Sequence, residues 1–140
     1  MRRDFPATRG YLDMTTPSLS LKKIYSGKVR DLYEIDDKRM LMVATDRLSA
    51  FDVILEQPIP DKGKILTAIS NFWFDKLAHV VPNHFTGDRV EDVVPAAELP
   101  LVEGRAVVAK RLKPVAVEAI VRGYIVGSGW KEYQKSGTVC

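Results

Sequence analysis

The chain has 140 residues, of which 46% are hydrophobic and 28% charged, which suits one ordinary globular domain. Lys and Arg number 21 against 18 Asp and Glu, a net charge of +3, and no long basic run points to nucleic acid as a partner. The single cysteine, Cys140, rules out a disulfide framework, and no apolar run approaches the ~18 residues of a membrane span.

The first third of the chain is predicted to be mostly β. Residues 1–18 are interrupted by prolines and a glycine and predict an irregular arm. Alternating apolar residues predict strands over 21–25, 29–35 and 39–45, with a return to strand near Val53. The N-terminal region has no signal-peptide hydrophobic stretch, so we expect a cytoplasmic protein.

The pattern then changes to a helical period. The spacing predicts an amphipathic helix from Lys64, whose core face is formed by Ile65, Leu66, Ile69, Phe72, Trp73 and Leu77. Residues 83–104 predict a loop with a short helix, and residues 105–112 and 115–127 predict two further strands. Strands combined with a packed helix indicate an α+β fold, not a doubly wound sheet.

The turn Ser26-Gly27-Lys28 between the first two strands has an unusual composition. Two-residue hairpins favour Asn-Gly or Asp-Gly and need no basic residues. Lys28 and Arg30 stand two apart on a strand, so their side chains share a face. A glycine that permits close approach and two cations on one face suit a polyphosphate, whereas a solvated hairpin is the alternative.

The last predicted strand carries two charges on one face. Glu118 and Arg122 are about 13 Å apart at ~3.3 Å per residue, too far for an ion pair within the strand. Either each pairs with a neighbouring strand, or the two anchor a ligand through a carboxylate and a guanidinium. Gly127-Ser128-Gly129 then predicts a helix start, with Ser128 as its N-cap.

Two further polar clusters allow both structural and functional interpretations. "TDRLSAFD" places Asp46, Arg47, Ser49 and Asp52 at the end of a predicted buried strand, where they form either a functional loop or a loop staple. Lys62 and Lys64 at the start of the long helix oppose its dipole, which an adjacent anion would explain. His79 and His84 are interpreted as surface or packing residues, because no third ligand completes a metal set.

Four motifs in order resemble one family. "YSGKVRDLY", "TDRLSAFDV", "PDKGKILTAISNFWF" and "PVAVEAIVRGYIVGSGWKEY" are similar to the SAICAR synthetases, the phosphoribosylaminoimidazole-succinocarboxamide synthases of purine biosynthesis. The resemblance implies an ADP-forming ligase that uses ATP and Mg²⁺ to join L-aspartate to carboxyaminoimidazole ribonucleotide through a phosphorylated carboxylate. It also implies a β-rich nucleotide-binding lobe similar to ATP-grasp and protein-kinase folds.

The resemblance also assigns roles to residues and divides the chain. It implies an arm at 1–20, a nucleotide-binding lobe at 21–113 and the start of a second lobe at 114–140. The implied ATP-binding residues are Ser26, Gly27, Lys28, Val29, Arg30, Lys110, Arg111, Leu112 and Glu118, with Lys28 and Arg30 stabilising phosphate charge. The implied substrate-binding residues are Asp46, Ser49, Arg122 and Ser128.

The family's members are longer, and their acidic metal ligands lie in the later lobe. We therefore expect no metal ligands within these 140 residues and expect the chain alone to be incomplete as an enzyme. The expected partners are small molecules, with no nucleic acid and no membrane, and a homo-oligomer is left open. The alternatives are another ATP-grasp or kinase-like phosphotransferase, and a non-catalytic basic RNA-binding module.

Overall fold

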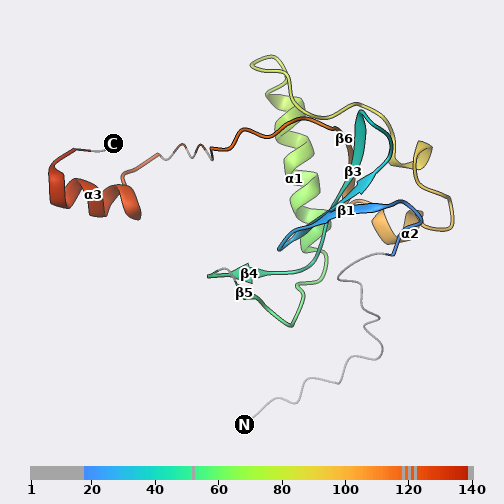
Figure 1. Ribbon diagram of the computed structural model, residues 1–140, viewed down its shortest axis with the longest axis horizontal. Coiled ribbons are helices and arrows are strands. Elements are labelled where there is room, and N and C mark those ends of the chain that lie inside the picture. Colours follow the sequence, from blue (N-terminus) through green and yellow to red (C-terminus); the bar gives the residue numbers. More distant parts are fainter. Residues whose placement is uncertain (1–17, 52, 118, 120, 122, 139–140) are drawn as a thin grey trace, which may run out of the picture.

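A four-stranded antiparallel sheet forms the body of the protein, with the strand order β1-β2-β3-β6 (Figure 1). The computed structural model describes residues 18–138 apart from 52, 118, 120 and 122. Its elements are β1 (Lys23–Ser26), β2 (Arg30–Glu34), β3 (Arg39–Ala44), β4 (Ser49–Ala50), β5 (Val53–Ile54), α1 (Lys62–Lys76), η1 (Val90–Asp92), α2 (Leu99–Val102), β6 (Ala106–Lys110) and α3 (Ser128–Ser136).

One face of this sheet carries the hydrophobic core. Alternate residues point to this face because side chains in a strand have a period of two, and the register pairs Tyr33 with Leu41 and Leu41 with Val108. The segment that contains η1 and α2 covers them with Val94 and Val102. The predicted α+β mixture of strands and helix is thereby confirmed, and the structure shows the sheet to be antiparallel; the short helix within residues 83–104 is also confirmed.

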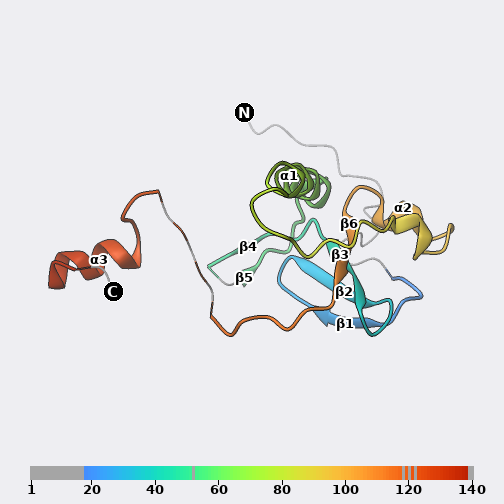
Figure 2. The same cartoon turned by 90° about the horizontal axis from the view of Figure 1, so that it is seen from above.

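The long helix α1 packs beside the sheet, mainly against β3 (Figures 1 and 2). Its closest approach is at Gly63, where an added Cβ would lie 2.5 Å from the carbonyl oxygen of Ala44. Thr67, one turn later, is buried, and Phe74 stacks at an angle on Phe85 with ring centroids 4.7 Å apart. The helix contacts the sheet through the side on which Gly63 and Thr67 lie.

The apolar stripe predicted as the core face of this helix is exposed instead. Phe72 and Trp73 were expected in the core, but 57% and 49% of their surfaces are accessible. Ile65, Leu66, Ile69 and Leu77 are similarly exposed. The helix itself was predicted correctly, but the predicted face was wrong, because the point of closest approach to the sheet has no room for a Cβ and is occupied by Gly63.

The strand predicted over residues 115–127 is also wrong for the described part of that segment. After β6 the chain leaves the sheet, and α3 stands apart from the sheet in both views (Figures 1 and 2). Apolar alternation alone does not make a strand, since the backbone also needs a partner strand for its hydrogen bonds.

The helix expected after this segment is present as α3, but its cap differs from the prediction. Ser128 is the first helical residue, and Gly127 occupies the cap position with a φ of 63° and no side-chain cap bond. Glycine adopts this positive φ without the steric cost of a Cβ. None of the helices described combines the length and apolar content needed to cross a membrane.

Candidate functional site

A cavity of about 300 Å³ lies between α1 and the sheet face opposite the core. Met42 and Val107 contribute an apolar wall from the sheet, and Leu66 contributes one from the helix. Polar groups come from Thr67, Ser70 and Asn71 on α1 and from Arg30, Lys62, His84 and Arg105 around the rim and floor. A concave site with apolar walls and a few converging polar groups is the usual form of a small-molecule site.

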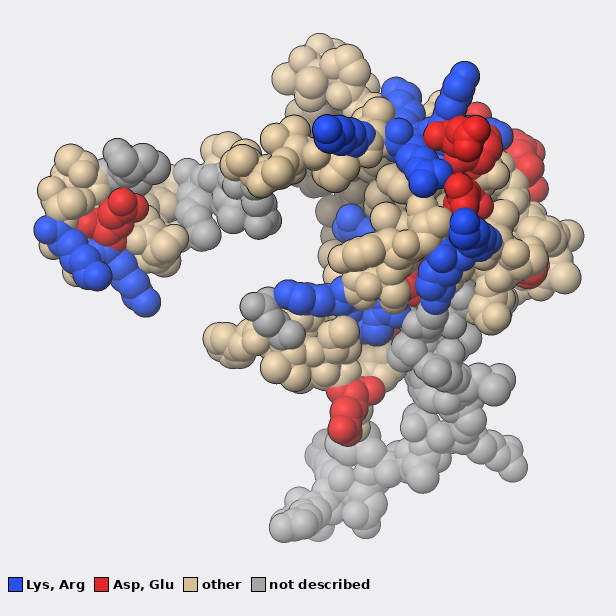
Figure 3. Space-filling view, in the orientation of Figure 1, with Lys and Arg blue, Asp and Glu red and all other residues tan. Residues whose placement is uncertain are grey.

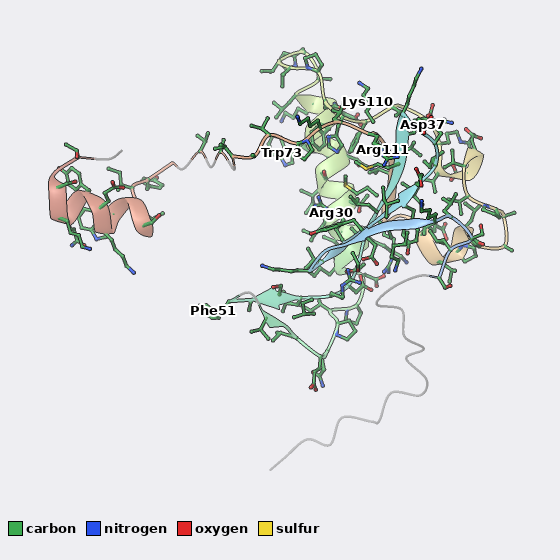
Figure 4. The ribbon with its side chains drawn as sticks, in the orientation of Figure 1. Arg30, Asp37, Phe51, Trp73, Lys110 and Arg111 are labelled. Carbon is green, nitrogen blue, oxygen red and sulfur yellow. The ribbon has the colours of Figure 1, made fainter. Side chains whose placement is uncertain are left out.

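Two cations in this cavity have no acidic partner among the residues that the structure describes. Neither Arg30 nor Lys62 forms an ion pair with any carboxylate in the described part of the chain. Figure 4 shows Arg30 between the sheet and α1. The cavity is therefore suited to an anionic ligand.

The pKa of His84 reflects the same positive environment. Burial, together with the charges of Arg30 and Lys110, lowers the pKa of His84 below its ordinary value. Its ring packs against Phe74 and Phe85 at centroid distances of 5.1 and 4.7 Å, which confirms the packing role predicted for it. A negative ligand in the cavity would reverse the electrostatic part of this shift.

The glycine turn lies at the mouth of the cavity, where Val29 and Arg30 join its lining. Gly27 donates its backbone N–H to the Arg30 carbonyl at 2.7 Å, which closes the turn tightly. A Cβ at Gly27 would lie 3.1 Å from both that carbonyl oxygen and the Tyr25 ring. Glycine is favoured here by close packing and not by backbone conformation, because Gly27 does not adopt a positive φ.

Behind the turn, Ser26, Asp31 and Arg47 form a hydrogen-bonded network that the sequence motifs did not predict as part of the site. Asp31 is fully buried, and its carboxylate accepts hydrogen bonds from Ser26 at 2.7 Å and from Nη2 of Arg47 at 2.8 Å. Burial by itself raises the pKa of Asp31, but the hydrogen bonds from Arg47 and Ser26 and the charges of Arg47 and Lys23 outweigh it, so the pKa lies below its ordinary value. Ser26, which the resemblance implies as an ATP ligand, thus donates its hydroxyl to a buried carboxylate.

The loop after β3, for which both a functional and a purely structural role were open, takes part in two separate ion pairs. Arg47 pairs with Asp31, whereas Asp46 pairs with Arg105, which is 4% exposed, at 3.2 Å. The other carboxylate oxygen of Asp46 accepts the Gly63 N–H at 2.9 Å. Both oxygens of this predicted substrate ligand are therefore engaged inside the protein.

The other predicted residues that precede residue 114 lie around the sheet. Ser49 is half-buried in β4 and pairs with Ile54 of β5. Lys110 ends β6 and donates Nζ to the Asn83 carbonyl, and Arg111 follows it and donates Nη1 to Glu34 at 2.9 Å (Figure 4). Leu112 is 61% exposed.

Of the other predicted positions, one lies away from the cavity and two are not described. Glu118 and Arg122, like Asp52, lie outside the described residues. Ser128 begins α3, which lies apart from the sheet. Lys28 is exposed at the turn itself, next to the residues that line the cavity.

The described residues do not fit a metal ion by themselves. Among them, no three His, Cys, Asp or Glu side chains gather at a point where they could hold one. Mg²⁺ prefers an octahedral set of oxygen ligands, often completed by substrate phosphates and water. We therefore assign no step to Mg²⁺ on these residues.

Comparisons with known proteins agree with the motifs. The family model for SAICAR synthetase matches residues 23–139. Phosphoribosylaminoimidazole-succinocarboxamide synthase from Chromobacterium violaceum is 81% identical over 121 residues, which cover 86% of this chain and 43% of that protein. The enzyme of the same name from Haemophilus influenzae strain PittGG is 73% identical over 124 residues, covering 89% of this chain and 43% of that protein.

A solved structure gives the same result. SAICAR synthase from Saccharomyces cerevisiae, complexed with SAICAR, is 44% identical with a TM-score of 0.81, and the match covers 91% of this chain and 46% of that one. The chain thus spans less than half the length of these relatives. With the family model matching most of its length, the chain belongs to the SAICAR synthetase family.

Proposed function

We propose that this chain supplies the ATP-binding part of a ligase that joins L-aspartate to carboxyaminoimidazole ribonucleotide, giving SAICAR, ADP and phosphate. The observation that carries the proposal is the cavity beneath the glycine turn, whose cations Arg30 and Lys62 have no acidic partner among the described residues. Family membership supports the same reaction.

In this proposal the nucleotide lies along the open face of the sheet. Met42 and Val107 offer an apolar surface for the base, and Arg30 and Lys62 offer positive charge for the phosphates. Lys28 at the turn adds a further cation, and residues Lys110 to Leu112, directly after β6, would contact the adenine edge. This is the arrangement of a kinase-like nucleotide-binding lobe.

The chemistry requires a carboxylate to become an acyl donor. The γ-phosphoryl group of ATP moves to a carboxylate oxygen of the ribonucleotide as the bond to ADP breaks. The amine of aspartate then attacks the acyl carbon, the C–N bond forms, phosphate leaves and the amine gives up a proton. Because phosphoryl transfer is catalysed mainly by positioning and charge neutralisation, this lobe would contribute cations at fixed positions.

The proposed substrate contacts remain those implied by the family motifs. Asp46, Ser49, Arg122 and Ser128 would serve the ribonucleotide, and Glu118 would serve the ATP ribose. Asp46 is engaged by Arg105 and Gly63, so we propose that it acts by holding its loop in place. The metal and aspartate sites are proposed to require residues outside this chain.

The test is a chimeric enzyme in which these residues replace the matching segment of the Chromobacterium violaceum relative. We expect ADP release with Mg²⁺-ATP and the ribonucleotide only when L-aspartate is present, with SAICAR formed in equal amount. The Arg30→Met variant should raise the KM for ATP, and Arg89→Met, an exposed arginine outside the cavity lining, is the matched control.

Two other outcomes would favour the alternatives. ADP release that does not depend on L-aspartate would indicate another phosphotransferase. RNA binding whose affinity falls steeply with salt would indicate a nucleic-acid module. On the face shown in Figure 3, basic side chains lie beside acidic ones over the sheet and form no continuous strip, which favours the ligase.

A further inference from the structure

Four successive carbonyl groups of the glycine turn accept hydrogen bonds from within the protein. The Gly27 carbonyl accepts Nη2 of Arg47 at 2.9 Å, and the Lys28 carbonyl accepts Nε of the same side chain at 3.2 Å. The Val29 carbonyl accepts both the backbone N–H and the hydroxyl of Thr45, at 3.0 and 2.9 Å. The Arg30 carbonyl accepts the Gly27 N–H. Every carbonyl oxygen of residues 27–30 is therefore engaged within the protein.

Arg47 can hold the turn because it is itself fixed. Both terminal nitrogens of Arg47 contact the carboxylate of Asp31, at 3.3 and 2.8 Å, and that carboxylate is wholly buried in β2. Only 11% of the Arg47 side chain is exposed. The planar guanidinium thus bridges a strand and two consecutive loop carbonyls, a geometry that the single ammonium of lysine does not reproduce.

We propose that Arg47 is a positioning residue for the nucleotide, which keeps the turn oxygens away from the phosphates. Carbonyl oxygens carry partial negative charge, and a loop free to rotate them toward an anion would repel it. By binding two of them, Arg47 removes that repulsion before the ligand arrives, so less free energy is lost in ordering the loop on binding. The inference rests on the proposed ATP site and adds a residue that does not line the cavity.

The experiment uses the 140-residue chain and two matched arginine variants. Arg47→Lys keeps a cation beside Asp31 but loses the bidentate fork, and Arg39→Lys removes an equivalent fork from the Asp36 and Asp88 pairs on the surface. Amide hydrogen exchange is followed at Gly27 and Thr45, whose N–H groups bond within the turn network, with β3 amides as the reference. ATP affinity is measured on the same samples.

For Arg47→Lys we expect exchange at Gly27 and Thr45 to rise about tenfold and ATP to bind about tenfold more weakly, the scale of losing charge-assisted hydrogen bonds. Exchange in β3 should be unchanged, and Arg39→Lys should change neither quantity. In Arg47→Ala, millimolar guanidinium chloride should restore part of the ATP affinity, while the same concentration of sodium chloride should not.

Each result decides the question. The inference is overturned if amide hydrogen exchange at Gly27 and Thr45 in Arg47→Lys stays at the wild-type rate. It is also overturned if this exchange becomes faster while the ATP affinity is unchanged. If wild-type chain binds no ATP, the proposed nucleotide site fails, and the exchange measurement then shows separately whether Arg47 orders the turn.

Discussion

Asp46 and Arg105 lie 59 residues apart in sequence, yet Oδ2 of Asp46 is 3.2 Å from Nη2 of Arg105 in the interior of the protein. The pair joins the loop after β3 to the start of β6, and the second oxygen of Asp46 binds the first turn of α1. One carboxylate therefore ties together a loop, a strand and a helix around the cavity.

Removing this carboxylate should strongly destabilise the fold. Asp46→Ala leaves the Arg105 charge buried without its partner, which typically costs about 3–5 kcal/mol of unfolding free energy. Asp88→Ala, which breaks the exposed pair with Arg39, should cost less than about 1 kcal/mol. Urea unfolding followed by circular dichroism measures both. Equal losses in the two variants would show that Asp46 does not join these elements.

Two glycine-to-alanine changes should have opposite signs. Alanine at Gly63 places its Cβ 2.5 Å from the Ala44 carbonyl oxygen, so α1 must move and stability should fall by about 1–3 kcal/mol. Alanine at Gly129 in α3 meets nothing closer than Ile125 at 4.0 Å, and it should raise helix content, because alanine favours the helix by about 1 kcal/mol. Circular dichroism and urea unfolding distinguish them. A stabilising Gly63→Ala would contradict the packing described for α1.

The stability should decline in acid, in part through Asp31. The folded pKa of Asp31 is depressed, so its contribution is present above the unfolded value of about 3.9 and is lost as the pH falls through the folded value. Asp31→Asn should be less stable at neutral pH and should show a shallower loss below about pH 4. Urea midpoints across the acid range test this. Parallel curves for the variant and wild type would assign the acid sensitivity to other carboxylates.

Nucleotide binding should be linked to protonation of His84. Its pKa is lowered by burial and by the charges of Arg30 and Lys110, so a polyanion beside Arg30 should raise it and draw in a proton. As the pH falls toward about 6, the ratio of the Kd for His84→Gln to that of wild type should therefore increase.

Using a ratio of dissociation constants cancels the titration of the nucleotide's own phosphates. Calorimetry in buffers of different ionisation enthalpy counts the protons taken up. His79→Gln, at an exposed histidine, is the control and should match wild type. A ratio that does not vary with pH would place the bound phosphates away from His84.

The chain should associate with itself as its concentration rises. The stripe on α1 leaves Ile69 and Trp73 half exposed, and the tip of the β4–β5 hairpin carries Phe51 fully exposed and pointing away from the sheet (Figure 4). Exposed apolar surface of this kind favours association. Sedimentation velocity should show larger species for wild type and fewer for Ile69→Glu combined with Trp73→Glu.

The control for this prediction changes charge without removing apolar surface. Asp75→Lys, at an exposed position on the same helix, should associate as wild type does. A wild-type chain that stays monomeric at all concentrations tested would show that the stripe on α1 does not drive association.

The sequence by itself predicted the local elements and the family. β2, β3 and α1 follow from periodicity, which depends only on neighbouring residues, and the four motifs identify the family because their order and spacing are specific. The glycine turn was predicted from composition alone. Its position at the mouth of a cavity with basic residues came from the structure.

The tertiary structure decided which surfaces meet. Periodicity in α1 cannot distinguish the face that packs from the face that stays exposed, because that choice depends on the fit of Gly63 against Ala44. Residues 115–127 alternate as a strand does, yet their described part forms none, because a strand also requires a partner edge. The pairing of Arg47 with Asp31 arises only when β2 and the loop after β3 are brought together, since long-range contacts are set by strand register and packing.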